Sequence, residues 1–374
     1  MRQYERNFDA FTHGCLAGLD WSNIVVAGSA ALLPLLPPRQ DVELDYCPSE
    51  ADPLESYYEH TAGSSDIDIF VHGLGDDEER ALKKIRSVEA TLRRNQRIGP
   101  GGGGGGGGGM ALRTANAVTL IAPRWPYRHV QIILRLYASV GELLAGFDVD
   151  CACVAFDGSQ VWTSPRGAAA IATRTNTVDL SRRSPSYENR LYKYRNHNFD
   201  VYWPLLDRSR INHDACNTSS SRSGSDGAGP RNLNGLARLV FFEAALRRRD
   251  HHGAGHRAAY RRRRRLKKID ESGRPPAHSG YAAVEVPYGQ RYTARRVQKF
   301  IAQRSREPHV FGDLETVLEQ GTAATGSSRK RDRTPRLQGR VRFLRDDPGR
   351  QMVGSFYPLT EDDWTAQAYT PSTT

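Results

Sequence analysis

The sequence lacks any long apolar run. No stretch of its 374 residues approaches the roughly 18 consecutive apolar residues that are needed to span a bilayer. The N-terminal residues MRQYERNFDAF contain no apolar signal-peptide core. These absences argue against a membrane-spanning or exported protein, and they predict a nuclear or cytoplasmic location with no membrane partner.

Cysteine is also scarce. The five cysteines are an odd number and show no spacing that is typical of metal ligands. A disulfide framework is therefore not expected, and reduced thiols fit the predicted location. The pair Cys151 and Cys153 is most simply explained as part of a core.

Positive charge is scarce in the first part of the chain. Residues 1–170 carry 15 Lys and Arg against 21 Asp and Glu, although the whole chain has a net charge of +11. This acidic part lacks the cluster of Lys and Arg residues with which an enzyme binds a nucleic-acid duplex, which argues against a repair polymerase. Nearly all the excess lies in residues 238–268, which carry 12 Lys and Arg against 2 acids. Two interpretations of that stretch stay open: a nuclear-localisation signal or a patch that binds nucleic acid or another polyanion, and a solvated run of arginines.

A pair of acids inside an apolar run is the most informative motif. In GSSDIDIFVHGL, Asp66 and Asp68 alternate with Ile67 and Ile69. Successive side chains of a strand point to opposite faces, so both carboxylates lie on one face and the isoleucines enter a core. Two like charges on a largely buried strand favour a cation between them. Oxygen ligands and a phosphate substrate favour Mg²⁺.

A second motif lies upstream of the acid pair. Residues 24–27 form an apolar run that predicts a short buried strand, and Gly28-Ser29 predicts a tight turn into a helix. The N-terminus of such a helix offers free N–H groups to an anion.

The order of strand, Gly-Ser, helix and a strand with Asp-hydrophobic-Asp resembles the DNA polymerase β-like nucleotidyltransferase superfamily. The resemblance covers roughly residues 1–165. It implies that Gly28 and Ser29 hold the phosphates of a nucleoside triphosphate, and that Asp66 and Asp68 bind the metal that aligns an acceptor hydroxyl with the α-phosphate. The combination of GSSDIDIF, FDVDC, RSPSYENRLYKY and PGRQMVGSF also resembles a group of uncharacterised fungal proteins.

The sequence departs from the superfamily pattern in two places. Thirty-six residues separate Ser29 from Asp66, so an insertion from Pro37 to Thr61 must loop out. The superfamily has a third carboxylate on a later strand, whereas Gln131 stands at the corresponding place in WPYRHVQIILRLY. An amide cannot accept the proton of a hydroxyl. Asp148 and Asp150 in GFDVDCACVAF are the nearest substitutes, and Asp150 is our candidate for the base; a solvated start of a core strand is the alternative.

A stretch rich in arginine and tyrosine follows, RRSPSYENRLYKYRNHNFDVYWP, residues 182–204. One interpretation is a helix with a tyrosine face that packs on the preceding domain. In the other, Arg190, Lys193 and Arg195 contact a triphosphate or an acceptor.

The expected fold class is α+β. We expect a nucleotidyltransferase-like mixed sheet flanked by helices, with a largely disordered, basic C-terminal half. The expected divisions are a nucleotidyltransferase-like domain with a Gly-rich insertion at 1–165, an appended helical segment at 166–215, a disordered basic linker at 216–280 and a small, partly ordered C-terminal segment at 281–374.

Two functions are consistent with these motifs. The first is Mg²⁺-dependent transfer of a nucleoside monophosphate from a nucleoside triphosphate to an acceptor hydroxyl, with Asp66, Asp68 and Asp150 as catalytic groups. The second, favoured by Gln131 and the basic stretch, is an inactive scaffold of the same fold that binds protein or nucleic acid. An interaction protein without any relation to nucleotides is a third class.

Overall fold

The structure is a computed structural model. It describes residues 1–38, 52–63, 65–96, 109–183, 187–204, 206–207, 209, 286–304, 308–320, 337 and 339–344. The predicted basic stretch 238–268, the predicted linker 216–280 and nearly all of the Gly-rich insertion lie outside these residues. The chain divides into two compact units, the first from residues 1–146, 152–167 and 282–348 and the second from residues 147–151, 168–281 and 349–374.

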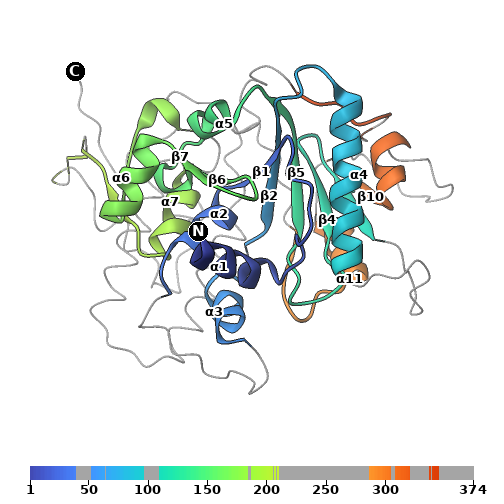
Figure 1. The fold of residues 1–374 in the computed structure, drawn as a ribbon, viewed down its shortest axis with the longest axis horizontal. Helices are drawn as coiled ribbons and strands as arrows, with labels where there is room; N and C mark the ends of the chain where they lie inside the picture. Colours follow the sequence, from blue (N-terminus) through green and yellow to red (C-terminus); the bar gives the residue numbers. More distant parts are fainter. Residues whose placement is uncertain are drawn as a thin grey trace, which may run out of the picture. The chain divides into compact units, whose positions relative to one another are not determined.

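An eight-stranded mixed sheet organises the first unit (Figure 1). Its order is β10-β3-β4-β5-β2-β1-β6-β7. The pair β2 and β5 is parallel, and the other neighbouring pairs are antiparallel. The strands are β1 (Ile24–Ala27), β2 (Ile67–His72), β3 (Met110–Arg113), β4 (Ala117–Ile121), β5 (Val130–Tyr137), β6 (Val154–Phe156), β7 (Val161–Thr163) and β10 (Val310–Gly312).

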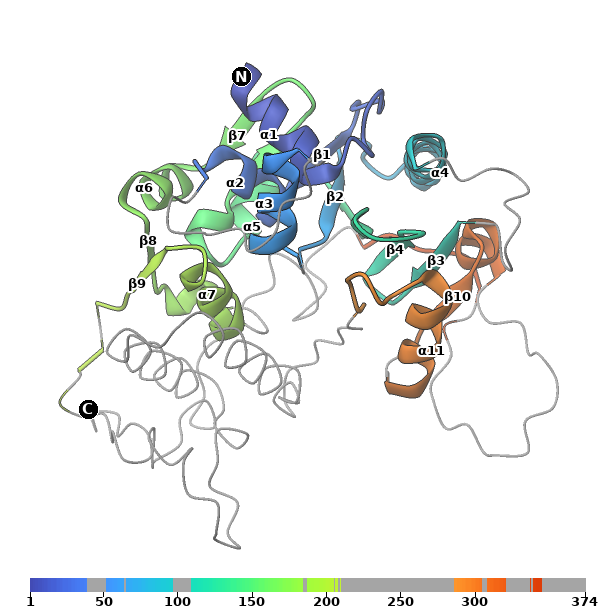
Figure 2. The same ribbon diagram turned by 90° about the horizontal axis from the view of Figure 1, so that it is seen from below.

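Helices cover both faces of this sheet. At the β3 and β4 end, α4 lies on one face and α11 on the other (Figure 2). The helices of the first unit are α1 (Arg2–Thr12), α2 (Ser29–Leu35), α3 (Pro53–Thr61), α4 (Glu78–Asn95), α5 (Val140–Gly146) and α11 (Ala294–Arg304). None of the helices in the described part of the chain combines the length and the apolar character that a membrane crossing requires.

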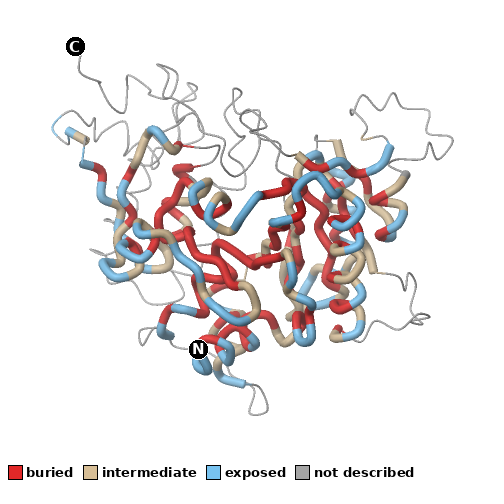
Figure 3. The backbone as a smooth tube through the Cα atoms, turned by 45° about the horizontal axis from the view of Figure 1, so that its top comes forward, coloured by how far each residue is buried: buried red, intermediate tan, exposed pale blue. Residues whose placement is uncertain are grey.

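The sequence explains why α4 forms and which side it buries. The side chain of Asp77 caps its start by accepting a hydrogen bond from the N–H of Arg80 at 2.9 Å. Leu82, Ile85 and Val88 recur at helical spacing and are buried. The central strands are buried along most of their length (Figure 3). The core therefore lies between this sheet and its helices.

Residues near the C-terminus complete the first unit. Strand β10 pairs with β3 at one edge of the sheet. Leu344 forms a bridge to Arg135 in β5. Arg113 of β3 donates hydrogen bonds to the carbonyls of Val317 and Gly339 at 3.0 and 2.8 Å. These contacts make the described part of residues 286–344 an integral part of the sheet domain.

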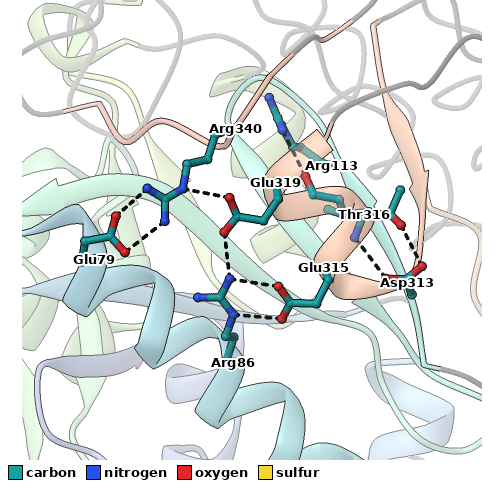
Figure 4. A network of polar contacts seen from close by, with 9 residues as sticks. Glu79, Arg86, Arg113, Asp313, Glu315, Thr316, Glu319 and Arg340 are labelled. Atoms are coloured by element: carbon teal, nitrogen blue, oxygen red, sulfur yellow. Dashed lines mark hydrogen bonds and ion pairs between the residues drawn. The ribbon is translucent and has the colours of Figure 1, made fainter.

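A surface network of ion pairs joins the same residues to α4 (Figure 4). Arg86 pairs with Glu315 at 2.9 Å and with Glu319 at 2.8 Å. Arg340 pairs with Glu319 at 3.0 Å and also with Glu79. Two arginines therefore alternate with three glutamates between α4 and the helical turn Thr316–Gln320. Because these side chains are partly exposed, each pair stabilises the contact only modestly.

The second unit contains a small two-stranded parallel sheet of β8 (Thr175–Thr177) and β9 (Asp200–Tyr202). It also contains helix α7 (Tyr187–Arg195) and the 3₁₀ turn Leu180–Arg182. The boundary between the units falls inside two elements, which are α6 (Pro165–Thr173) and the 3₁₀ turn Asp150–Ala152.

The predicted α+β class with a mixed sheet and helices is confirmed. The predicted strand 24–27 is also confirmed. The insertion Pro37–Thr61 differs from a simple loop, since its last nine residues form α3 with Asp52 as the N-cap. The predicted boundaries at 165 and 281 lie within two residues of the unit boundaries at 167 and 281. The described part of the predicted C-terminal segment 281–374 packs with the sheet domain through β10 and α11.

Candidate functional site

The turn after β1 has a conformation that requires glycine. Gly28 has φ 71° and ψ −137°, a region that side chains exclude. Its N–H donates to the carbonyl of Val154 at 3.0 Å, and its carbonyl accepts from the N–H of Leu32 at 2.9 Å. Ser29 begins α2 and is 6% exposed. Gly28 thus starts the helix and ties it to β6, and its own N–H is already used inside the protein.

The predicted acid pair lies at the start of β2. Asp66 immediately precedes the strand, and Asp68 is its second residue. Both are partly exposed, whereas the alternate residues Ile67 and Ile69 are fully buried. The alternation predicted from the sequence is therefore observed, and the two carboxylates are two residues apart at one end of the strand.

Gln131 lies directly beside Asp68. The two residues are register partners in the parallel pair β2 and β5. On the other side, Ala27, which precedes the Gly28 turn, is the partner of Asp68 in β1. The structure thus brings the glycine turn, Asp68 and Gln131 to one end of three adjacent strands.

A continuous row of opposed residues crosses the sheet through this point. We call it the Asp68 row, and it consists of Trp162, Ala155, Ala27, Asp68, Gln131, Thr119, Leu112 and Phe311. Directly opposed residues point to the same face of a sheet. Asp68, Gln131 and Thr119 therefore form a polar segment that has two alanines on one side and two large apolar residues on the other.

Arg128 fixes the backbone that leads into the acid pair. Its side chain is fully buried and donates to the carbonyls of Phe11, Tyr58, Ala62 and Ser65, at 2.7, 3.1, 2.6 and 2.9 Å. These carbonyls belong to the last turns of α1 and α3 and to the residue before Asp66. Burial lowers the pKa of Arg128, and the charges of Tyr288, Cys15, Glu59 and, least of all, Asp66 oppose this effect. The guanidinium thus satisfies two helix ends and places a positive charge near Asp66.

His129 has both ring nitrogens engaged. Its Nδ1 accepts from the N–H of Ala122 at 3.0 Å, so its Nε2 carries the proton and donates to the carbonyl of Pro287 at 3.2 Å. Burial lowers the pKa of His129, while the Pro287 carbonyl and Asp66 oppose this effect. The imidazole is therefore neutral and is held in one orientation by these two hydrogen bonds, and it is not available as a base.

The donor set fits Mg²⁺ better than a metal that needs a complete protein cage. No group of three or more His, Cys, Asp or Glu side chains with metal-binding geometry exists in the part of the chain that the structure describes. Mg²⁺ commonly uses one or two carboxylates and keeps several waters or phosphate oxygens. Asp66 and Asp68 suit that mode of binding, and the amide oxygen of Gln131 is a neutral oxygen donor beside them.

Asp148 and Asp150 do not lie on a strand, which corrects the expectation from the sequence. Strand β6 begins only at Val154, and Asp150 opens a 3₁₀ turn. Both acids belong to the second unit. Asp148 pairs with Arg190, and Asp150 accepts from the N–H of Thr177 at 2.9 Å. Each carboxylate therefore has a structural partner, and a catalytic role for Asp150 stays a prediction.

The arginine- and tyrosine-rich stretch contains helix α7. Tyr187 and Leu191 are fully buried, which agrees with a packed helix that has a tyrosine face. Arg190 pairs with Asp148, and Arg195 pairs with Asp200 at 3.2 Å. Lys193 lies 5.8 Å from the ring centre of Tyr194. These contacts are internal to the second unit, and binding of a triphosphate or an acceptor by these side chains stays a prediction.

Arg128 and His129 were not identified from the sequence. They directly precede the strand that carries Gln131, but a lone Arg-His pair has no pattern that distinguishes it from surface residues. Their partners, Phe11, Tyr58 and Pro287, are distant in sequence. Only the folded structure brings these groups together.

Comparisons with known proteins concern the same part of the chain. The Gabija anti-defense 2 family matches residues 2–174, which include the glycine turn, the acid pair and Gln131. An uncharacterised protein of Acanthamoeba polyphaga mimivirus is 28% identical over 151 residues, or 39% of this chain. The chain matches about a third (33%) of the length of that relative. The site region is thus the part that is similar to a family described as anti-defence proteins.

Proposed function

We propose that the chain is a Mg²⁺-dependent nucleotidyltransferase that moves a nucleoside monophosphate from a nucleoside triphosphate to an acceptor hydroxyl. The observation that supports this most directly is the register of β1 and β2. It sets the residue before the Gly28 turn opposite Asp68, so the glycine turn and the acid pair share one end of the sheet.

Asp66 and Asp68 would hold the metal. Bound Mg²⁺ would supply a positive charge that stabilises the phosphate oxygens in the transition state. Arg128 positions the backbone of Ser65 and thereby the start of β2. Gly28 gives the chain its turn into α2, whose first residues would face the phosphates.

The transfer is a displacement at the α-phosphorus. The acceptor oxygen forms a bond to phosphorus, the bond from that phosphorus to its bridging oxygen breaks, and pyrophosphate leaves with the electron pair. The hydroxyl proton must pass to a base. Gln131 is neutral and cannot accept the proton, so a water molecule would take it in this proposal.

Calorimetric titration of the full chain with nucleoside triphosphates and Mg²⁺ tests this proposal. We expect Mg²⁺-dependent binding that is lost in Asp66→Asn/Asp68→Asn. The matched control is Asp76→Asn/Glu78→Gln, which removes the same charge near the other end of β2. Equal binding by the wild type and the Asp66/Asp68 double variant would contradict the assignment, as would an absence of binding in all three proteins.

Gln131 also favours a second candidate function. A site without an acid at this position fits a scaffold that has the fold but has lost the chemistry, and that binds nucleic acid or protein. Such a scaffold keeps its binding activity in Asp66→Asn/Asp68→Asn. A transferase instead releases pyrophosphate when acceptor is supplied, and it stops doing so in that double variant.

The biological setting that we propose is antagonism of a host defence, because the family that matches residues 2–174 is described as Gabija anti-defense. Viral infection of cells that carry the Gabija defence, with and without this chain, tests the idea. We expect the chain to restore viral growth. If Asp66→Asn/Asp68→Asn restores it equally, the scaffold function is favoured over the transferase.

A further inference from the structure

Helix α11 carries an exposed side that is basic and contains no acid. Its exposed residues are Arg295, Arg296, Gln298, Lys299, Ala302 and Gln303, and Arg291 is exposed just before it. Its buried residues, Val297 and Ile301, pack on Leu112 and Ile121 of the sheet. The helix therefore has one apolar side against the sheet and one cationic side that faces solvent.

This helix lies on the same face of the sheet as the acid pair. Leu112, on which it packs, belongs to the Asp68 row. Three strand spacings separate the two residues, which corresponds to about 14 Å across the face. Helix α4 lies on the opposite face (Figure 2).

The chain that enters α11 also contacts the residues beside the acid pair. Pro287 accepts the hydrogen bond from His129. The ring of Tyr288 lies 4.8 Å from the ring of Trp125, and its hydroxyl donates to the carbonyl of Pro126. Arg291 follows three residues later. The cationic side of α11 therefore begins three residues after a segment that contacts His129 and Trp125.

Helix stability does not explain the charge of these residues. Arg296 donates to the carbonyl of Arg291 at 2.7 Å, but Arg295 and Arg296 both lie in the first turn, where positive charge opposes the helix dipole. Among the described residues, no carboxylate pairs with Arg291, Arg295, Arg296 or Lys299. The basic residues of α4, by contrast, are accompanied by three glutamates in the same helix.

We propose that the exposed side of α11, with Arg291, Arg295, Arg296 and Lys299, binds the phosphate backbone of a single-stranded nucleic acid. The row of cations matches a polyanion. Large apolar side chains, which would insert into a membrane, are absent from the exposed residues of this helix. In a further step, which rests on the proposed transferase function, the terminal hydroxyl of that strand is the acceptor that reaches Asp66 and Asp68.

Fluorescence anisotropy of a labelled single-stranded DNA of about 20 nucleotides, titrated with the full chain over a range of salt concentrations, tests the surface. The test variant is Arg295→Gln/Arg296→Gln/Lys299→Gln. The matched control is Arg80→Gln/Lys83→Gln/Arg94→Gln, which removes three exposed charges from α4 on the opposite face. We expect the test variant to bind at least about tenfold more weakly at low salt, with a salt slope lower by about 2, since each phosphate contact on a single strand contributes about 0.7. The control should match the wild type.

Two results would overturn the proposal. One is a test variant that binds like the wild type or no worse than the control. The other is a loss of binding to anionic lipid vesicles in the test variant with DNA binding unchanged. Titration with Mg²⁺ and nucleoside triphosphate separates the two proposals. If the chain binds DNA through α11 but binds no nucleotide, the proposed transferase function is refuted and the proposed nucleic-acid-binding surface is supported.

Discussion

The guanidinium of Arg128 donates a hydrogen bond to the carbonyl of Ser65 at 2.9 Å, one residue before Asp66. Three further carbonyls bind the same side chain. Replacement by Met would remove this donor from all four carbonyls, of which, among the described residues, only those of Tyr58 and Ala62 also accept from a backbone N–H. We expect Arg128→Met to lower the free energy of unfolding by about 3–5 kcal/mol.

Arg113→Met provides the control for this change. Arg113 is also buried but donates to only two carbonyls, those of Val317 and Gly339. We expect a loss of about 1–3 kcal/mol, measured like the first by urea unfolding. Equal losses of unfolding free energy in the two variants would show that the four hydrogen bonds of Arg128 stabilise the protein no more than the two of Arg113.

The register of Asp68 and Gln131 leads to a prediction about metal binding. Gln131→Asp adds a third carboxylate beside the pair, so Mg²⁺ should bind about tenfold more tightly, which corresponds to about 1.4 kcal/mol. Without metal, the added like charge should destabilise the protein by up to about 1 kcal/mol. Calorimetry and urea unfolding with and without Mg²⁺ measure both effects. Gln131→Asn is the uncharged control, and equal Mg²⁺ affinity in the two variants would argue that Asp68 is not a metal ligand.

His13 should make stability depend on pH. Burial, together with the charge of Arg128, lowers its pKa to about 4. The unfolded chain, with a histidine pKa near 6.5, therefore takes up the proton first as pH falls from 6.5 to 4. The free energy of unfolding then decreases by at most about 1.4 kcal/mol per pH unit. Burial raises the pKa values of Glu55 and Glu59, and this has the opposite sign.

His13→Asn isolates the contribution of the histidine. Asn tolerates the positive φ of 52° at this helix end. We expect the variant to lose less stability than the wild type between pH 6.5 and 4, measured by urea unfolding at several pH values. His60→Asn, at an exposed position of α3, is the control for removal of an imidazole. Parallel pH curves for wild type and His13→Asn would refute the prediction.

Gly158 lies against the ring of Trp21. A Cβ at this glycine would come within 2.2 Å of the Trp21 ring, and its φ is +92°. We expect Gly158→Ala to cost about 2–4 kcal/mol, since both the ring and the backbone must shift. At Gly75, with φ +54°, a Cβ would meet nothing within 4 Å, so Gly75→Ala should cost only about 1 kcal/mol. Thermal unfolding compares the two variants. Similar unfolding midpoints for Gly158→Ala and Gly75→Ala would show that the Trp21 ring does not obstruct a side chain at Gly158.

Local patterns predicted the elements whose signal is contained in a short window. The alternation around Asp66 and Asp68 located β2, and the apolar run 24–27 located β1. The position of Gln131 at the start of a strand could also be anticipated. These features depend on periodicity, which a single sequence displays.

Features that depend on contacts between distant segments could not be predicted. The carbonyls that bind Arg128 come from two helices and a loop, so no spacing marks this residue. The expected start of a core strand at Asp148 and Asp150 is not observed, and the two acids have partners that no local pattern shows, namely Arg190 and the Thr177 backbone. The position of the basic side of α11 could not be predicted, because the sequence does not show that this helix packs on the face of the sheet that carries Asp68.

The pairing of β10 with β3 has a consequence for synthesis of the chain. Leu112 and Phe311, which are register partners, lie about 200 residues apart. At ribosomal rates of about 5–20 residues per second, the edge of β3 emerges about 10–40 seconds before the strand that covers it. An uncovered edge strand readily pairs with other chains. Successful folding of this protein in a cell therefore depends on how that edge is protected while translation is still under way.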